Sequence, residues 1–537
     1  MTLLAGFLDV LLRGVGSIAL AAAVGGVVYA LAVLRPVSAG SPLGVPTLAR
    51  AVALIGAGAV LVAASEALVL LLIHPWALAD ERGRWPLAEF LGTEYARAGL
   101  LRIVLALGLW AVSRRLRGAV TSGRAWLAAI VVSALLMIDA AWLAHAVGRL
   151  EGRASLMTVT VLHQLGAVLW VGGLIHLVGF ALLWRRYRDA DAVALAVLRR
   201  VSVLALTSMV LILGPGLYLA WRYIASWDGL IGTGYGVMVL TKVALLAAAV
   251  VLGALNLFLL RRPATEATRL NLRVSAFIEA EVGLGLTLLL AASSLTSLPP
   301  SVDVVADRAA PSEVGARFVP KMPRLSSPPV GQLLAVAAPI EDTLATRQPA
   351  EYAWSEYNHH TAGLFVVLMG VLALLDRTGR ARWARHWPLL FLGLAAFLFV
   401  RNDPRAWPLG PAGFWESMRL PDVLQHRLVV LLVIALGVFE WLVRTGRIRR
   451  PAWWFAFPVL CATGGALLLT HSHAMFNLKS EFLAEVSHAP MGVLAVFMGW
   501  GRWLELRLDP ADRRLPGMIW SASLLLIGLI LLFYRET

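Results

Sequence analysis

Charged side chains are scarce in this chain. Only 15% of its 537 residues are charged while 59% are hydrophobic, and the mean hydropathy is +0.77. A soluble protein carries about 25% charged residues, so the composition excludes an ordinary soluble fold. Apolar runs of about 18 to 25 residues recur instead, and each is long enough to cross about 30 Å of hydrocarbon. The composition therefore predicts a polytopic membrane protein.

Cysteine is nearly absent. The single Cys461 lies inside an apolar run, which excludes a disulfide framework and a thiolate cluster for zinc or iron–sulfur. No P-loop of the form GxxxxGKS or GxxxxGKT occurs, so we do not expect pumping by ATP hydrolysis within this chain. The start of the chain lacks a basic n-region and a clear cleavage site, and we expect a retained first span rather than a signal peptide.

Lysine is almost as rare, and the net charge of +15 comes mainly from arginine. Arginine gathers in alternate loops between the apolar runs, at 114–117, 185–188, 261–262, 377–382 and 444–450. This alternation is the positive-inside pattern and excludes a nucleic-acid patch as its explanation. It predicts that both termini lie on the extracytoplasmic side of the membrane.

Fourteen apolar runs define the expected organisation. We predict spans at 14–34, 50–73, 96–113, 125–147, 158–184, 200–221, 236–260, 274–297, 359–375, 386–400, 422–442, 452–471, 486–503 and 516–534. The polar stretch 298–356 contains proline and serine and indicates an extracytoplasmic linker. We therefore expect an all-α membrane bundle, with an eight-span module over 1–297 and a histidine-rich six-span module over 357–537.

Histidine, by contrast, is concentrated on one side. Imidazole is the commonest metal ligand in proteins and titrates near neutral pH, so such a concentration predicts a metal or haem protein. Nine of the eleven histidines fall near the predicted outer ends of the spans: His74, His145, His163, His359, His360, His426, His471, His473 and His488.

The fifth span carries two histidines at different depths. His163 lies near the outer surface and His176 follows thirteen residues later. In a helix the two are about 140° apart in azimuth and about 20 Å apart in depth, so one ion cannot bind both. They belong to two sites, or one of them is a packed core residue. Gly172 and Gly173 lie between them and permit close helix approach.

Other ionisable residues lie within the first module. Bare carboxylates are disfavoured in lipid, so these side chains indicate either a polar route for an ion or proton or a structural hydrogen-bonding role. We expect Lys242 to neutralise a carboxylate at its own level, and Glu281 to lie near the level of Asn256. The full set is Glu66, Asp139, Lys242, Asn256, Glu279 and Glu281.

The second module is richer in possible ligands. The ninth span opens with His359 and His360, and the short connection after the twelfth span makes the twelfth and thirteenth an antiparallel pair. Imidazole suits Cu(II) and thioether favours Cu(I). A single histidine at a helix end is commonly just solvated, but several on one face predict a metal or haem site. The candidates around this rim are His359, His360, His426, His471, His473, Met475, Glu485, His488 and Met491, the last three spaced as one helical stripe.

Three segments carry a family resemblance. They read HQLGAVLWVGGLIH at 163–176, TKVALLAAAVVLGALN at 241–256 and RVSAFIEAEVGLGLTLLLAASSLTSLPP at 273–300. Together they resemble the CopD family of copper-resistance and copper-transport membrane proteins, most closely over 155–300. The resemblance implies copper handling at the bacterial cytoplasmic (inner) membrane.

We therefore expect a copper-binding membrane protein that takes copper from the periplasmic side and moves it across or hands it on. Its expected partners are the lipid bilayer, copper and a periplasmic copper chaperone; we expect neither nucleic-acid binding nor enzymatic activity. A b-type haem electron-transfer protein is the first alternative, although no other span supplies a histidine pair matching that of the fifth. A copper-delivery scaffold for oxidase assembly is the second.

Overall fold

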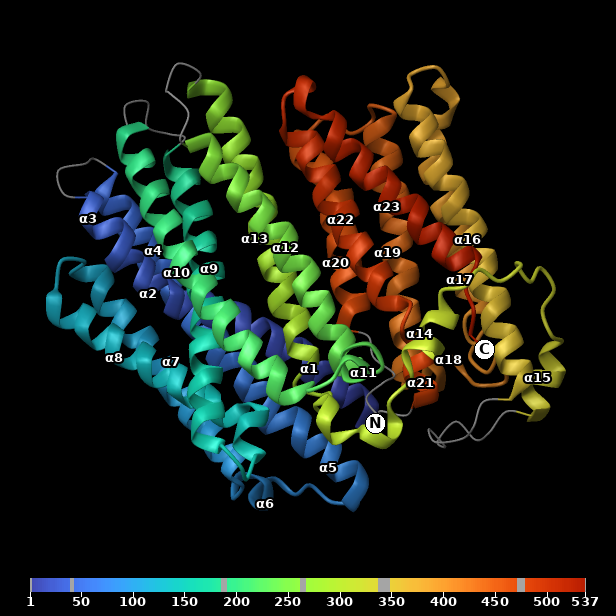
Figure 1. The fold of residues 1–537 in the computed structure, drawn as a ribbon, viewed down its shortest axis with the longest axis horizontal. Coiled ribbons are helices and arrows are strands. Elements are labelled where there is room, and N and C mark those ends of the chain that lie inside the picture. Colours follow the sequence, from blue (N-terminus) through green and yellow to red (C-terminus); the bar gives the residue numbers. More distant parts are fainter. Residues whose placement is uncertain are drawn as a thin grey trace. The chain divides into compact units, whose positions relative to one another are not determined.

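The part of the chain that the structure describes is built from helices. The computed structural model describes residues 2–38, 43–184, 191–260, 267–336, 348–470 and 479–536, and no β-strand occurs among them. Fourteen helical segments there are long and apolar enough to cross a membrane (Figure 1). The predicted all-α class and number of spans are confirmed.

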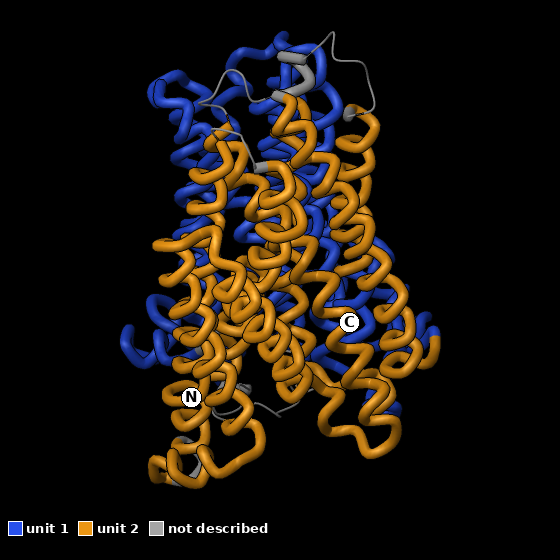
Figure 2. The backbone as a smooth tube through the Cα atoms, turned by 90° about the vertical axis from the view of Figure 1, so that its left-hand side faces the viewer, with its two compact units in different colours: residues 1, 227–241, 304–537 blue, residues 2–226, 242–303 orange. Residues whose placement is uncertain are grey.

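Two compact units divide the chain, coloured separately in Figure 2. Unit 2 comprises residues 2–226 and 242–303, and unit 1 comprises residues 1, 227–241 and 304–537. We expected the first module to end at residue 297. The division instead follows Asp303, and the short segment 227–241 belongs to unit 1.

Unit 2 contains the first eight candidate spans. The first is built from α1 (Thr2–Leu20), the π-helical turn η1 (Ala21–Gly25), α2 (Gly26–Tyr29), a second π-helical turn η2 (Ala30–Leu34) and α3 (Arg35–Ser38). The others are formed by α4 (Gly44–Leu68), η3 (Val69–Ile73), α5 (His74–Arg82), α6 (Leu87–Leu91), α7 (Glu94–Gly118), α8 (Gly123–Asp139), η4 (Ala140–Leu143), η5 (His145–Gly148), α9 (Arg153–Trp184), α10 (Asp191–Tyr223), most of α12 (Gly234–Leu260) and α13 (Ala267–Ser294), followed by η7 (Ser301–Asp303).

Several predicted span boundaries in unit 2 are wrong, and two of them affect candidate residues. The first span covers Leu4–Val37 rather than 14–34, because helix formation continues through the preceding apolar residues. The fourth span ends at Leu143 rather than 147, because Ala144 takes an extended backbone conformation. His145 consequently lies beyond the span, in η5.

Close backbone contact around α9 holds the core of unit 2. α9 packs against η1, α2, α4, α10 and α13, and α9 and α10 run side by side in Figure 1. Where α9 meets η1, a Cβ atom on Gly172 would overlap the Ala21 carbonyl oxygen and lie 2.8 Å from the Gly25 Cα. A Cβ on Gly173 would instead approach the Leu204 side chain. Gly172 therefore permits the close approach that small residues give membrane helices.

Unit 1 contains the remaining six candidate spans. Before them come α11 (Trp227–Ile231), the start of α12, η8 (Val305–Asp307), α14 (Pro311–Arg317) and α15 (Val330–Val336). The spans are formed by α16 (Pro349–Arg377), η9 (Arg382–Leu389) with α17 (Leu390–Arg401), α19 (Pro421–Arg444), η10 (Pro451–Phe455) with α20 (Ala456–Thr470), α21 (Lys479–Glu485) with α22 (His488–Arg507), and α23 (Arg514–Leu532); α18 (Phe414–Met418) and η12 (Pro510–Asp512) are short connecting helices.

The predicted linker ends earlier than expected. α16 begins at Pro349, so residues 349–356 belong to a helix. Proline suits the first turn of a helix, where its missing N–H costs nothing, and Glu351 accepts a hydrogen bond from the Gln348 main-chain N–H at 2.8 Å. From residue 304 on, the described linker residues belong to unit 1, where the Arg317 guanidinium donates to the Glu536 carbonyl oxygen at 2.5 Å.

The thirteenth span is interrupted. α21 ends at Glu485 and α22 begins at His488, with two turn residues between them. Pro490 explains the break, because a proline cannot donate to the carbonyl group four residues earlier and is tolerated only in the first turn of a helix. The predicted stripe of Glu485, His488 and Met491 is therefore wrong, since Glu485 lies on the preceding helix. α20 does pack along α22, as the short connection predicts.

A network of buried ion pairs joins three helices of unit 1. Glu440 on α19 is 0% exposed, and its Oε1 accepts from Arg444 Nε at 2.6 Å and from Arg502 Nη2 at 3.1 Å. Arg502 on α22 also pairs with Glu505 at 2.7 Å, and Arg377 of α16 pairs with the same carboxylate. Pairing offsets the cost of placing these charges in apolar surroundings. The network fixes the positions of α16, α19 and α22 within the unit.

We expect Gly172→Ala to destabilise the protein, because the added methyl group overlaps the Ala21 carbonyl and pushes α9 from η1. Overpacking of this kind costs about 1–3 kcal/mol, so the thermal unfolding midpoint of the full chain in detergent should fall. Gly108→Ala on α7 is the matched control, since nothing lies within 4 Å of a Cβ built there. Equal midpoints for the two variants would contradict the close contact.

Candidate functional site

The first histidine of α9 binds a main-chain carbonyl group beside a proline kink. His163 Nδ1 lies 2.9 Å from the Ile212 carbonyl oxygen on α10. Pro215 has no N–H, so the Leu211 carbonyl group, four residues earlier and next to Ile212, lacks its helical donor. A Cβ on Gly216 would lie 3.0 Å from His163 Cε1, so the glycine leaves room for the ring.

His176 is held in the same way at another level of α9. Its Nε2 lies 2.8 Å from the Ala22 carbonyl oxygen, within the π-helical turn η1, where the regular hydrogen-bonding pattern is altered. A Cβ on Gly26 would overlap this ring nitrogen. His176 is 2% exposed, and within the described residues neither its Nδ1 nor the Tyr29 hydroxyl has a hydrogen-bond partner. The two rings lie 5.5 Å apart between centroids.

These contacts fix the tautomer of each ring. A carbonyl oxygen only accepts, so the bonded nitrogen must carry the proton: Nδ1 in His163 and Nε2 in His176. The other nitrogen of each neutral ring keeps a lone pair. Imidazole binds metal ions in this state, with its N–H oriented by a carbonyl or carboxylate. Because separate helices anchor them, the two histidines belong to two positions rather than one.

An acidic cluster lies against α9 in the same unit. Glu281 on α13 is 6% exposed, and its Oε1 accepts from Trp170 Nε1 at 3.2 Å. The Asn256 side chain of α12 is a second hydrogen-bond partner, so Glu281 and Asn256 meet as their predicted levels require. Glu279 on the same helix bonds Ser275 instead. Spacing alone does not reveal Trp170 as the partner of Glu281.

A second acidic group joins three helices. Arg102 on α7 is 9% exposed, and its Nε lies 3.7 Å from Glu66 Oε2 of α4. Asp139 at the end of α8 is 5% exposed and interacts electrostatically with both. Arg102 interrupts an apolar run and could have been recognised as a counter-charge from that alone. Lys242, by contrast, acts electrostatically on His163.

His74 is oriented by a carboxylate. Its Nε2 lies 3.2 Å from Asp9 Oδ1, and Arg13 binds the other oxygen of Asp9 at 2.6 Å. The ring stacks on Phe90 with centroids 5.6 Å apart. A carboxylate behind an imidazole is common in metal sites. The span predicted at 14–34 does not include Asp9, whereas the span of the structure, Leu4–Val37, does. His145 bonds the Leu295 carbonyl oxygen at 2.7 Å and fixes η5 on the end of α13.

The rings of two rim histidines of unit 1 lie near each other, in an edge-to-face arrangement. His359 Nδ1 lies 2.9 Å from the Ser355 carbonyl oxygen, and His488 Nδ1 lies 3.2 Å from that of Glu485. Each therefore carries its proton on Nδ1. The ring centroids are 6.0 Å apart, and Tyr534 stacks on His359 with centroids 4.0 Å apart.

His360 has a different role. Its Nδ1 accepts from the Arg324 main-chain N–H at 2.6 Å, and its Nε2 donates to the Tyr534 carbonyl oxygen at 2.8 Å. Both ring nitrogens are occupied, so the prediction of His360 as a metal ligand does not fit this structure. The neighbouring Glu356 is 2% exposed and pairs with Lys321. These contacts attach the linker to α16.

The remaining candidates of unit 1 are dispersed. His426 Nδ1 lies 3.0 Å from Asp403 Oδ1, a carboxylate-oriented arrangement like that of His74. Met491 is buried one turn after His488. His471, His473 and Met475 lie outside the described residues. Across the ranges that are described, no group of three His, Cys, Asp or Glu side chains is arranged to hold a metal ion.

The α9 tautomers can be measured. With ¹⁵N-labelled histidine, the imidazole nitrogen signals should show a protonated Nδ1 in His163 and a protonated Nε2 in His176, because each bonds a carbonyl oxygen. Single His163→Asn and His176→Asn variants assign the signals. The same tautomer at both positions would contradict the anchoring.

Part of the chain is similar to known proteins. A family model described as Copper resistance protein D matches residues 195–295. The copper transport protein CutJ of Bacillus subtilis (strain 168) is 32% identical over 200 residues, which is 37% of this chain and 35% of the relative. The chain thus matches about a third of the relative's length, and no solved structure matches it.

The matched segment contains Pro215, Lys242, Asn256 and Glu281, but begins after His163 and the rest of α9. It lies mostly in unit 2. Its helices supply the carbonyl group that binds His163 and two members of the cluster around Glu281. On this evidence the chain carries a CopD-family region over residues 195–295.

Proposed function

We propose that this protein handles copper in the bacterial cytoplasmic membrane, taking the ion from the extracytoplasmic side and moving it across or handing it on. The observation that carries the proposal is the match to the copper resistance family in the unit that also holds the two oriented imidazoles of α9. Copper is the cargo, and the proposed role is binding and transfer rather than catalysis.

The donor set suits this cargo. Copper takes imidazole nitrogen in its Cu(II) state and accepts thioether sulfur in its Cu(I) state. Main-chain carbonyl groups accept hydrogen bonds from Nδ1 of His359 and of His488, which orients both rings. We propose this pair as the capture position of unit 1. His471, His473 and Met475 remain predicted ligands of the same rim.

Unit 2 offers a separate series of polar positions. His163 and His176 occupy two levels of α9, and the buried Glu281 lies beside Trp170 on the same helix. We propose that an ion moves between such positions, since permeation needs several weak sites rather than one deep energy well. The Glu66, Arg102 and Asp139 group supports the neighbouring helices.

The arginine-rich alternate loops support an orientation with both termini outside. Histidines such as His359 then face the periplasm, where we propose a copper chaperone as the partner. Direct delivery to an oxidase during assembly would use the same rim ligands. The haem alternative gains no support from the family match, which concerns copper.

The rim pair is tested by metal analysis. We expect the double variant His359→Asn and His488→Asn to weaken copper binding of the purified chain by at least about tenfold, because both proposed ligands are removed. Elemental analysis and competition titration measure this. His386→Asn is the control, since His386 bonds Trp441 away from the rim. Wild-type copper affinity in a folded double variant would contradict the proposal that His359 and His488 bind copper.

The α9 route is tested in cells. We expect His163→Ala to lower copper accumulation or copper tolerance, because it removes one position from the route. Thr158→Ala, on an exposed face of the same helix, provides the matched control. Unchanged copper phenotypes at normal expression of His163→Ala would show that α9 does not carry copper.

A further inference from the structure

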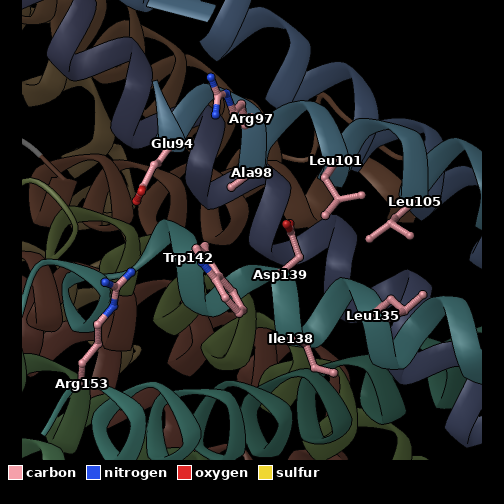
Figure 3. A pocket seen from close by; sticks show the side chains of 10 residues that line it. All are labelled: Glu94, Arg97, Ala98, Leu101, Leu105, Leu135, Ile138, Asp139, Trp142 and Arg153. Carbon is pink, nitrogen blue, oxygen red and sulfur yellow. The ribbon is translucent and has the colours of Figure 1, made fainter. Parts of the chain in front are cut away.

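A side pocket opens between helices of unit 2, away from both α9 histidines. Its volume is about 480 Å³. Figure 3 shows the side chains around it, which come from the start of α7, the end of α8 with η4, and the first residue of α9. Because α7, α8 and α9 follow one another in alternating directions, these ends share one membrane interface.

Four charged side chains line the pocket, two of each sign. They are Glu94, Arg97, Asp139 and Arg153. Within the described chain none of the four forms an ion pair with another or with a further residue. Asp139 is 5% exposed, and its Oδ2 has no hydrogen-bond partner there. Arg102, which does not line the pocket, acts electrostatically on Asp139. Charges of both signs that are not paired across the space can bind a ligand.

The walls below these charges are apolar and outward-facing. Leu101, Leu135 and Ile138 line the pocket and are 51%, 45% and 49% exposed. In a membrane-spanning segment such surfaces contact acyl chains rather than water. An empty space of this size forfeits packing contacts, so lipid is the natural occupant. Trp142, 42% exposed, stands at the level where tryptophan meets headgroups.

We propose that this pocket is a binding site for a phospholipid with a zwitterionic, primary-ammonium headgroup. Arg153 binds the phosphate, for which a guanidinium group is well suited. Glu94 and Asp139 accept hydrogen bonds from the ammonium group, and the apolar walls hold the upper parts of the acyl chains. This proposal is independent of the copper function.

The lining charges select this headgroup over others. The charges of the two acidic and two arginine side chains that line the pocket sum to zero. A lipid with a net negative charge would therefore leave the carboxylates without a cationic partner. A quaternary ammonium has no N–H for Glu94 and Asp139 and is usually held by several aromatic rings, whereas Trp142 is the one aromatic side chain among the residues lining this pocket. A primary ammonium satisfies both carboxylates.

Native mass spectrometry of the full chain tests the site. The delipidated protein is mixed with equal phosphatidylethanolamine, phosphatidylcholine and phosphatidylglycerol. We expect wild type to retain phosphatidylethanolamine preferentially, and the double variant Glu94→Gln and Arg153→Gln to lose about tenfold of that affinity. Arg84→Gln is the control, because Arg84 is exposed and pairs with Glu89 outside the pocket.

A second variant fills the pocket without changing charge. Ala98→Phe places a ring in the space that Ala98 now borders and should reduce retention of the lipid, provided that the thermal unfolding midpoint is unchanged. Equal retention of the three lipids by wild type would overturn the proposal. So would preferential retention of phosphatidylglycerol, or retention that neither the double variant nor a folded Ala98→Phe variant reduces.

Discussion

The histidines of α9 depend on main-chain carbonyl groups of neighbouring helical segments. In an apolar medium each main-chain polar group is paired within its own helix, and the second lone pair of a carbonyl oxygen can still accept from an imidazole N–H. His163 uses the Ile212 carbonyl oxygen of α10, three residues before Pro215, and His176 uses the Ala22 carbonyl oxygen of a π-helical turn. Adjacent glycines admit the rings. The neighbouring carbonyl groups thus set the tautomer of both imidazoles.

The same constraint explains where charge is found. Buried acids such as Glu440 and Glu281 are hydrogen-bonded or ion-paired with side chains of other helices, so each also ties helices together. The pocket beside Asp139 differs, because among the described residues no ion pair joins the charged side chains that line it. Paired charge therefore indicates structure in this protein, whereas unpaired charge at a pocket indicates a ligand.

Hydropathy and residue spacing predict the all-α class, the fourteen spans and the close approach at Gly172, because each depends on local sequence alone. They also place His163 and His176 in separate positions. They do not predict that His360 is occupied at both ring nitrogens, since its partners come from a distant linker and the chain end. Pro490 does signal the break before α22, although periodicity alone suggests a continuous stripe.

The central claim is that imidazole groups of this protein bind copper. X-ray absorption spectroscopy of the purified full chain, loaded with copper and desalted, tests it most directly. We predict nitrogen scatterers at about 2.0 Å together with the outer-shell pattern of imidazole rings. Loss of copper on desalting, or a copper environment without imidazole scattering, would contradict the account.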